Sequence, residues 1–379
     1  MSGTRSFVKR LLVFILKIPV IITENQKKFL KKKTEMQYYE RKQMNSMGGE
    51  DMCQKDIWEA DLKKILIKVD SDELLTREDA VALLHIDNYS EGFYTLLAKA
   101  NELSRKEYGD KGYVFAQIGL NSSPCPGNCK FCSLAYNNFV VEKETEKTRE
   151  EVLDETKRAV EEGVDALFLM TTADYDFEKY LEISREVKKL LPEDTMFIAN
   201  IGDFDETGAK KLKEAGFTGA YHIVRLNEGI DTNLPVEQRE RTLDAIQKAG
   251  LELIYCVEPI GPEHTYEQMA DEMLRARRYN VNVMACMKRV CVPGTPLYEK
   301  GEITDLELTK IVAVTRLVTR PKKSMNVHEP KQMALLAGVN QLYAEIGINP
   351  RDCAADTEQN RGSSIEAMRD MLKQAGYSR

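Results

Sequence analysis

The sequence predicts an α/β protein whose main domain is a closed (β/α)8 barrel preceded by a short helical region. Short β-branched or apolar segments recur along the chain, and each is followed by a charged segment with helical periodicity. Eight such units can be counted, which is the number that closes a barrel. No glycine-rich dinucleotide fingerprint follows a predicted strand, which favours the barrel over the runner-up, an open doubly wound sheet.

The elements follow in a regular order. In "LLTREDAVALLHI" a near capping box begins a first helix, and "EGFYTLLAKANELSRKEYG" forms a second. The predicted strands are 113–119, 164–170, 196–201, 219–225, 251–257, 281–287, 324–327 and 339–343. Helices with Ala-Gly or Glu-Gly at their ends are expected between many of these strands, since glycine suits a C-cap. The helices after the strands are predicted at 149–163, 177–191, 205–216, 236–250, 265–280, 304–318, 330–338 and 363–376.

We expect three regions along the chain. Residues 1–52 form a basic, disordered leader, 53–110 a helical lead-in, and 111–379 the barrel with a C-terminal capping loop and helix. Residues 1–50 carry eleven Lys/Arg and four Asp/Glu, or +7, so the remainder of a chain with net charge −7 carries −14. An acidic body of this kind argues against nucleic acid as a partner.

The leader contains an apolar run over residues 11–22 that is interrupted by Lys17 and Pro19. This run is too short to span a bilayer, which needs ~20 residues. A disordered leader, or a physiological start at a downstream Met, is favoured over contact with a membrane. The eight cysteines do not form the dense framework of a small secreted domain, so we expect a cytoplasmic protein.

The stretch "SSPCPGNCKFCSLAYNN" holds Cys125, Cys129 and Cys132 with the spacing C-x3-C-x2-C, directly after the first predicted strand. A tetrahedral zinc site would normally have four ligands, and no His lies nearby. Three thiolates can hold a [4Fe–4S] cluster and leave one iron open for a further ligand. The spacing therefore favours an iron–sulfur cluster over structural zinc or incidental thiols.

This motif, with an aromatic residue before its last cysteine, resembles the hallmark of the radical S-adenosylmethionine (SAM) superfamily. "VEPIGPEHT" resembles a G-x-I-x-G-x-x-E region, and "VPGTPL" a loop, of its biotin synthase-like branch. That branch includes biotin synthase, archaeal-type lipoyl synthase, hydrogenase maturase and methylornithine synthase. The resemblance implies a TIM-type barrel in which a [4Fe–4S] cluster cleaves SAM to a 5′-deoxyadenosyl radical, which then abstracts hydrogen from an unactivated carbon.

The resemblance also implies which residues contact the cofactors. "TTAD" stands where the family has a GGE-like motif for the SAM amino group, so this chain departs from the pattern there. Each arginine in the set could instead form a surface ion pair. The expected cofactor-binding residues are Phe131, Thr171, Thr172, Asn200, Arg225, Arg239, Glu258 and Ile260.

Four further cysteines follow predicted strands or end them, namely Cys256, Cys286, Cys291 and Cys353. They are candidates for an auxiliary iron–sulfur cluster like the sulfur source of biotin synthase, or they are buried thiols that pack as small hydrophobic groups. Ala199–Asn200 and Asn326 stand near positions where biotin synthase has further cluster ligands, so this chain departs from the pattern of biotin synthase itself there. His222 and His328 end strands, where each could reach a substrate or form a hydrogen bond within the barrel.

The leading prediction is a sulfurtransferase of the biotin or lipoyl synthase type. The alternative enzyme is a mutase or maturase that rearranges a carbon skeleton or matures a metallocofactor, and outside enzymes the alternative is an electron carrier or sensor. Expected partners are a small-molecule or carrier-bound substrate and a reducing flavodoxin or ferredoxin. A homodimer and a pairing with a second radical SAM protein both stay open.

Overall fold

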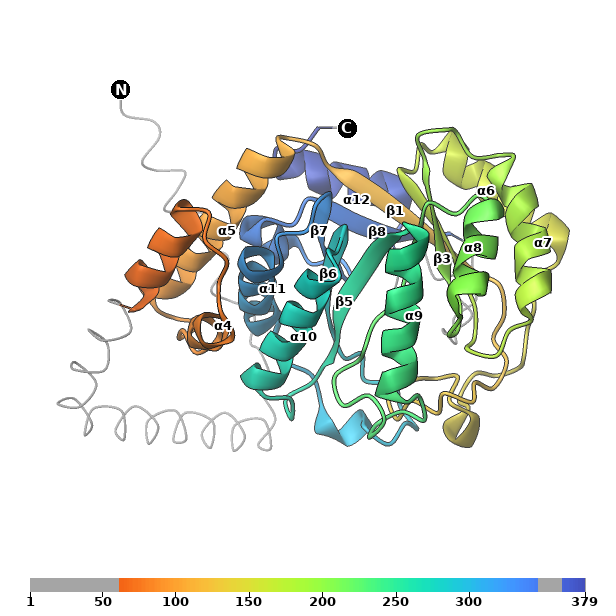
Figure 1. Ribbon diagram of the computed structural model, residues 1–379, viewed down its shortest axis with the longest axis horizontal. Coiled ribbons are helices and arrows are strands. Elements are labelled where there is room, and N and C mark those ends of the chain that lie inside the picture. Colours follow the sequence, from red (N-terminus) through yellow and green to blue (C-terminus); the bar gives the residue numbers. More distant parts are fainter. Residues whose placement is uncertain (1–60, 347–362, 379) are drawn as a thin grey trace, which may run out of the picture. The chain divides into compact units, whose positions relative to one another are not determined.

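The computed structural model describes residues 61–346 and 363–378, and its eight parallel strands close into a barrel. Each strand pairs with the next along the chain, and β8 pairs with β1, so the sheet has no open edge (Figure 1). This closure confirms the predicted (β/α)8 barrel. The strands are β1 (Tyr113–Gly119), β2 (Ala166–Met170), β3 (Met196–Asn200), β4 (Gly219–Tyr221), β5 (Glu252–Ile260), β6 (Val283–Lys288), β7 (Ser324–His328) and β8 (Gln341–Glu345).

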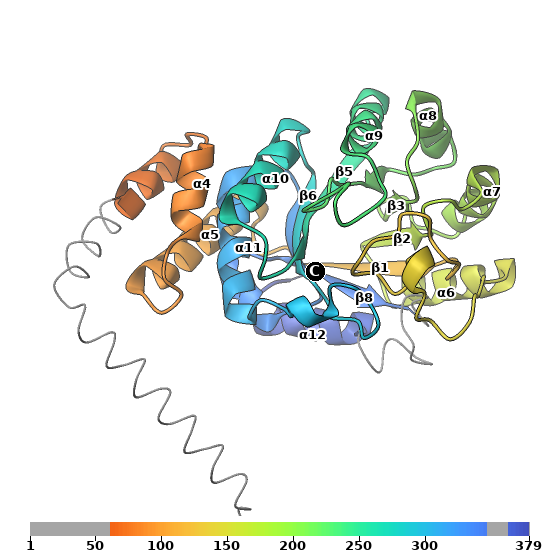
Figure 2. The same cartoon turned by 90° about the horizontal axis from the view of Figure 1, so that it is seen from below.

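Helices lie outside the strands and form the second layer of the barrel (Figure 2). Most begin at a Ser, Thr or Asp whose side chain accepts a hydrogen bond from the first turn, which is why the sequence predicted their starts well. After β7 the connection is a 3-10 helix, η4 (Gln332–Ala337). The α-helices of this layer are α6 (Arg149–Glu161), α7 (Phe177–Lys188), α8 (Glu206–Glu214), α9 (Val236–Ala249), α10 (Tyr266–Arg278), α11 (Asp305–Thr319) and α12 (Ile365–Gln374).

Strand β4 ends at Tyr221, four residues before the end that the sequence predicted. Beyond it the regular pairing with β5 is interrupted, because the Val224 amide donates to the hydroxyl of Tyr255 at 3.1 Å instead of to a backbone carbonyl of β5. That hydroxyl donates to Glu272 on α10 at 2.6 Å. The apolar run after Tyr221 is therefore a loop that a side chain holds in place. Strand β5 instead continues to Ile260, three residues past its predicted end.

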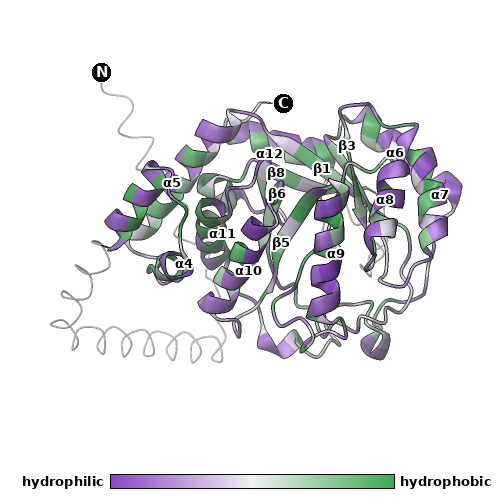
Figure 3. Ribbon diagram, in the orientation of Figure 1, coloured by the Kyte–Doolittle hydropathy of each residue, from purple (hydrophilic) through white to green (hydrophobic). Residues whose placement is uncertain are grey.

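The core has two parts. Alternate strand residues point inward and fill the barrel with a small cluster that includes Phe115, Phe168 and Tyr343, whose ring centroids lie 5.1–5.9 Å apart. The other strand residues point outward and pack against the helices in a much larger cluster. Figure 3 shows hydrophobic residues along β5 and many hydrophilic residues on the helices that surround the barrel.

The helical lead-in packs against the barrel's α11. It contains helical residues 61–70, α4 (Arg77–Leu84) and α5 (Glu91–Tyr108), and it forms one compact unit with the barrel from Asp61 onward. Arg316 of α11 is fully buried and donates to Ser104 of α5 at 2.7 Å. Because α4, α5 and η4 cover it, α11 is buried on all sides from Leu308 to Thr319.

The predicted leader over residues 1–52 lies outside the described residues, and so do residues 347–362, between β8 and α12, where the C-terminal capping loop is expected. Within 61–346 and 363–378, no helix is long and apolar enough to cross a membrane.

Gly202 follows β3 at a point where the loop after β2 crosses it closely. A Cβ at this position would lie 2.0 Å from the carbonyl oxygen of Ala173, which is backbone and cannot move independently. Gly202→Ala should therefore destabilise the protein by about 1–3 kcal/mol or more through overpacking, measured as a lower midpoint in thermal unfolding.

The matched control is Gly92→Ala at the start of α5, where the nearest atom to a Cβ is a side-chain carbon at 3.3 Å. This variant should unfold close to the parent temperature. Equal midpoints for Gly202→Ala and the parent would contradict the close approach of the two loops.

Candidate active site

The cysteine loop follows β1 at the C-terminal rim of the barrel. The Cys125 amide donates to the Leu134 carbonyl at 2.7 Å, and the Tyr136 amide donates back to the Cys125 carbonyl at 3.1 Å, so the loop closes on itself. Asn128 takes a left-handed conformation with φ 47°, which Asn tolerates better than most residues. Its side chain accepts from the Asn137 amide at 2.8 Å. The backbone thus holds the three thiols on one short turn.

The three thiols of this loop are free and half-buried. Burial raises the pKa of Cys129 to about 12, with Cys132 and Cys125 also acting to raise it, whereas the charge of Arg225 lowers it. The three sulfur atoms and one guanidinium therefore share a common environment. Phe131, between two of the cysteines, is also half-buried.

The donor set fits an iron–sulfur cluster better than a single ion. Among the described residues, no three His, Cys, Asp or Glu side chains converge closely enough to hold one metal ion. Thiolates around a four-iron cluster each bind a different iron, so they stand further apart than the ligands of one ion. Three thiols on one loop suit a [4Fe–4S] cluster with one iron open.

A cavity of ≈ 80 Å³ opens at the same rim of the barrel, over the inward-facing ends of the strands. A larger hollow of ≈ 270 Å³ lies among the helix C-termini and strand starts near Asn280 and Asn282, at the opposite end. Barrel enzymes place their chemistry at the C-terminal end of the strands, so the smaller cavity is the candidate site. It is lined by Gln117, Phe168, Met170, Asn200, Tyr221, Arg225, Cys256, Glu258, Ala285, Met287, His328, Glu329 and Tyr343.

Arg225 lies between the cysteine loop and this cavity. It follows β4, lines the cavity, and its Nε atom lies 3.6 Å from Glu258 Oε1. Its Nη1 atom lies 3.5 Å from Glu228 Oε2. Of the predicted cofactor residues, Asn200, Arg225 and Glu258 are thus brought together at one cavity.

Arg239 is placed differently from the prediction. Its guanidinium is buried behind the cavity, donating to Asp203 Oδ1 at 2.9 Å and to the Ile223 carbonyl at 3.1 Å. Arg239 is not among the residues that line the cavity, and its guanidinium forms an ion pair with Asp203 instead. His222 is also buried there, with Nε2 3.2 Å from the same Asp203 oxygen. His222 is not among the residues that line the cavity, whereas His328 lines it and packs edge-on against Tyr343 with ring centroids 4.7 Å apart.

The predicted threonines lie at the end of β2 and contact the ends of β1 and β3. Thr172 accepts a hydrogen bond from Asn121 at 2.8 Å and donates its amide to Asn121 at 3.0 Å. The Thr171 amide donates to the Asn200 carbonyl at 3.0 Å, and its hydroxyl donates to the Thr172 carbonyl at 3.0 Å. These contacts fix the loops around the cavity. Asn121 was missed, although a polar residue just after a strand was a usable signal.

The loop after β5 is braced by a second residue that the sequence reasoning missed. The carbonyl of Ile260 accepts from the Arg289 amide at 2.8 Å, and the buried Arg289 side chain forms an ion pair with Glu263. A Cβ on Gly261 would lie 2.4 Å from Arg289 Nη1, so a side chain here would have to displace this buried guanidinium. Arg289 therefore links Ile260 and Glu263 within one turn at the rim.

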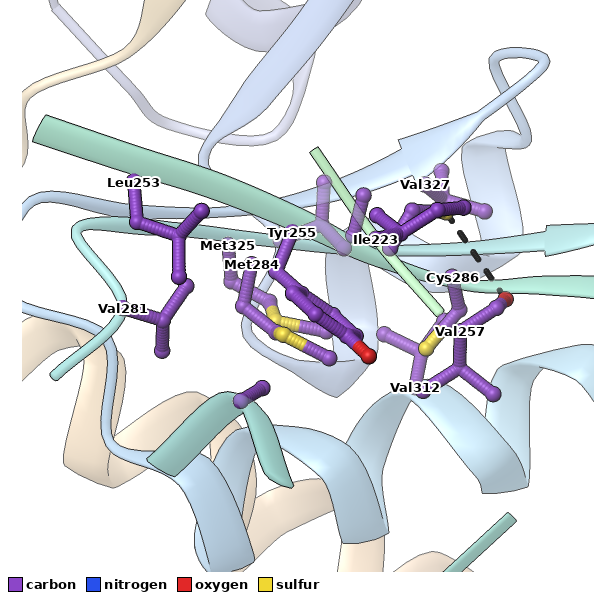
Figure 4. Close-up of a cluster of buried hydrophobic side chains, with 14 of the residues drawn as sticks. Ile223, Leu253, Tyr255, Val257, Val281, Met284, Cys286, Val312, Met325 and Val327 are labelled. Atoms are coloured by element: carbon purple, nitrogen blue, oxygen red, sulfur yellow. Dashed lines mark hydrogen bonds between the residues drawn. The ribbon is translucent and has the colours of Figure 1, made fainter. Parts of the chain in front are cut away.

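Two of the surplus cysteines lie on neighbouring strands and face opposite sides of the sheet. Cys256 of β5 pairs in register with Ala285 of β6, and its side chain faces the cavity. Cys286 of β6 pairs with Val257, one residue further along, so its side chain faces outward. Cys286 lies 3.2 Å from the Thr315 hydroxyl of α11 and packs beside Val257 and Val312 (Figure 4). The two thiols therefore point to opposite faces of the sheet, and an auxiliary cluster that includes either of them stays a prediction. Cys291 is half-buried in the loop after β6, and Cys353 lies outside the described residues.

Two comparisons of the sequence find similar proteins. Residues 123–306 match the family model described as the Radical SAM superfamily. Biotin synthase from Desulforudis audaxviator is 27% identical over 77% of this chain and 92% of its own length. Biotin synthase from Carboxydothermus hydrogenoformans is 25% identical over 65% of this chain and 80% of its own.

Two solved structures share the fold. Methylornithine synthase superposes with a TM-score of 0.71 at 19% identity, covering 83% of this chain and 96% of its own. The FeFe-hydrogenase maturase HydG from Carboxydothermus hydrogenoformans gives a TM-score of 0.69 at 16% identity, covering 84% and 79%. The predicted resemblance to the biotin synthase-like branch of radical SAM proteins is confirmed by the family model and the two biotin synthases, and the solved structures agree with the barrel fold.

Cys129→Ala should remove one of the three thiolates that a cube with one open iron requires. After anaerobic reconstitution, we expect iron and sulfide per chain to fall well below those of the parent and the cluster absorption to disappear. Cys286→Ala is the matched control, because that thiol is buried against α11 and away from the loop. Full cluster loading in Cys129→Ala would contradict the assignment.

The buried pair of His222 and Asp203 should make stability depend on pH. Burial and the charge of Arg239 lower the pKa of His222 to about 3, below the ordinary ~6.5 of an unfolded chain. The unfolded chain therefore binds a proton that the native protein excludes, and stability falls as the pH drops below about 6.5. The loss reaches at most about 3 kcal/mol near pH 4.

Asp203 adds to the loss only at lower pH. Burial alone would raise the pKa of Asp203, but contacts with His222 and Arg239 lower it to about 2, so its contribution is lost as the pH falls from about 4 to 2. The measurement is the unfolding temperature between pH 7 and pH 4.5 for the parent and for His222→Gln. We expect the smaller decrease in His222→Gln, and parallel curves would show that His222 is not buried in its neutral form.

Proposed function

We propose, from the premise that this chain is a radical SAM enzyme similar to biotin synthase, that it rearranges the carbon skeleton of a small molecule held in the rim cavity. Cofactor maturation that fragments such a molecule is the nearest variant of this chemistry. The observation that supports the proposal is the direction of the thiols. Among the described residues, Cys256 is the one surplus cysteine that lines the cavity.

The residues of the cysteine loop would hold the cofactors. Cys125, Cys129 and Cys132 would bind the [4Fe–4S] cluster through their thiolates. When bound, the cluster and SAM supply a 5′-deoxyadenosyl radical that abstracts hydrogen from an unactivated C–H. An external one-electron donor such as flavodoxin or ferredoxin would provide the electron.

Residues around the cavity would orient SAM and the substrate. Arg225 presents a guanidinium at the cavity, and such a group binds a carboxylate through two parallel hydrogen bonds. Asn200 offers an amide group on the neighbouring side of the cavity, and the threonines at the end of β2 fix the loop beside it. Phe168, Met287 and Tyr343 supply apolar walls that exclude water from a reactive radical.

Sulfur insertion is the second candidate, and two observations favour it. Cys256 faces the cavity, and the curated relatives are biotin synthases. A sulfur atom for insertion must lie within reach of the substrate radical, and a cluster held partly by Cys256 would meet this requirement. The reaction needs further ligands beside Cys256, which the outward direction of Cys286 does not supply.

Iron and sulfide counts distinguish the two candidates. For rearrangement we expect about four irons per chain in the reconstituted parent, and the same number in Cys256→Ala, because one cluster accounts for all of the iron. Both proteins should form 5′-deoxyadenosine from SAM when reduced. Deuterium transfer from candidate substrates into 5′-deoxyadenosine then identifies the carbon attacked.

The opposite result is equally specific. A parent with well above four irons per chain, whose excess is lost in Cys256→Ala, would contradict rearrangement and support sulfur insertion. A parent that holds a cluster but forms no 5′-deoxyadenosine would support an electron carrier or sensor. Cys286→Ala again serves as the control, and its iron content should equal that of the parent.

A further inference from the structure

The loop between β4 and α9, residues 225–234, contacts both halves of the site. The Leu226 amide donates to the carbonyl of Glu258, a residue that lines the cavity, at 2.9 Å. On the other side, the Lys130 amide donates to the Asp231 carbonyl at 2.9 Å, and the Asn233 amide donates to the Gly127 carbonyl at 2.7 Å. This loop therefore connects the cysteine loop to the cavity through the backbone.

Glu228 organises this loop from within. Its carboxylate is fully buried, and Oε1 accepts from the Thr232 hydroxyl at 2.6 Å. Oε2 accepts from the Arg225 backbone amide at 3.0 Å. The Thr232 hydroxyl in turn accepts from the Gly229 amide at 3.1 Å. Both carboxylate oxygens are thus used inside the loop, and Glu228 does not line the cavity.

The same carboxylate lies between two guanidiniums. Oε2 is 3.5 Å from Arg225 Nη1 and 3.8 Å from Arg239 Nε. Like charges this close repel each other in a low-dielectric environment, and a buried charge without a partner is costly. Asp203 holds Arg239 from the other side at 2.9 Å. Glu228 therefore offsets the repulsion and leaves the Arg225 side chain at the cavity.

We propose that Glu228 is a positioning residue that holds Arg225 ready for the carboxylate of SAM. The inference rests on the proposed function, since it takes the rim cavity as the SAM site. A side chain that is already ordered before the ligand arrives loses less freedom on binding, so its contacts contribute more to affinity. The effect acts through Arg225, because Glu228 itself is enclosed by the loop.

Two substitutions of Glu228 distinguish the effect of its contacts from the effect of its charge on SAM binding. Glu228→Asp keeps the charge but is one methylene shorter, so it cannot hold both Thr232 and Arg225. Glu228→Gln keeps the length but removes the charge. A positioning role predicts that Glu228→Asp raises the Kd for SAM about tenfold or more and that Glu228→Gln also raises it. A purely electrostatic role predicts an unchanged Kd for Glu228→Asp and tighter binding for Glu228→Gln.

The measurement is SAM binding to the reconstituted protein by calorimetry, together with the EPR spectrum of the reduced cluster before and after SAM. Without SAM, we expect Glu228→Asp to give the parent spectrum and iron content. With SAM at the parent's saturating concentration, we expect its spectrum to shift only partly. Arg225→Lys is the reference variant, because it loses the two-point contact directly.

Asp79→Asn is the matched control for the loss of a buried carboxylate. Asp79 is buried and pairs with Lys68 at 2.8 Å in the helical lead-in, away from the loop between β4 and α9. A similar loss of stability is expected there, with the Kd for SAM unchanged. Should the Glu228 variants fail to fold, Thr232→Val removes only the hydroxyl that holds Oε1. It should raise the Kd about threefold.

A Kd for Glu228→Asp within about twofold of the parent, at full iron content, would overturn the inference and leave the proposed function intact. For unfolded Glu228 variants, an unchanged Kd in Thr232→Val would do the same. Failure of the parent itself to bind SAM would overturn the proposed function, and the inference with it.

Discussion

Closure of the barrel is the constraint on which the other features depend. Because β8 pairs with β1, all eight strands end at one rim, and the loops that follow them must meet there. This closure brings residues from positions 117 to 343 around one cavity. The cysteine loop after β1 and the loop after β4 are neighbours at the rim for the same reason, although about a hundred residues separate them in the chain.

The pleat of the strands then decides which side chains line the cavity and which pack against the helices. Successive strand residues face opposite sides, so Tyr221 lines the cavity whereas His222 is buried behind it. The register between β5 and β6 separates Cys256 from Cys286 in the same way. A shift of one residue along a strand moves a thiol or an imidazole from the cavity to the side that packs against the helices. Such a group at a strand end can therefore face a ligand or fill the core, depending on its exact position.

Buried charge sets the roles of the arginines. Arg239, Arg289 and Arg316 each have a carboxylate partner at contact distance and little exposure, which the cost of burying an unpaired guanidinium explains. Arg225 is also paired, but its partners leave it at the cavity. The difference between a structural arginine and one available to a ligand thus depends on where its acidic partners stand.

From the sequence alone, periodicity and capping residues determined the eight βα units, and the spacing of Cys125, Cys129 and Cys132 determined the kind of cluster expected, because both signals are local. Contacts between loops distant in the chain were decided only by the tertiary structure. Neither the pairing of Arg239 with Asp203 nor the bracing by Arg289 has a local signal. The early end of β4 likewise depends on Tyr255 of the next strand. Register and long-range pairing arise only when the barrel closes. The sequence alone therefore could not tell which strand cysteine faces the cavity and which faces the helices.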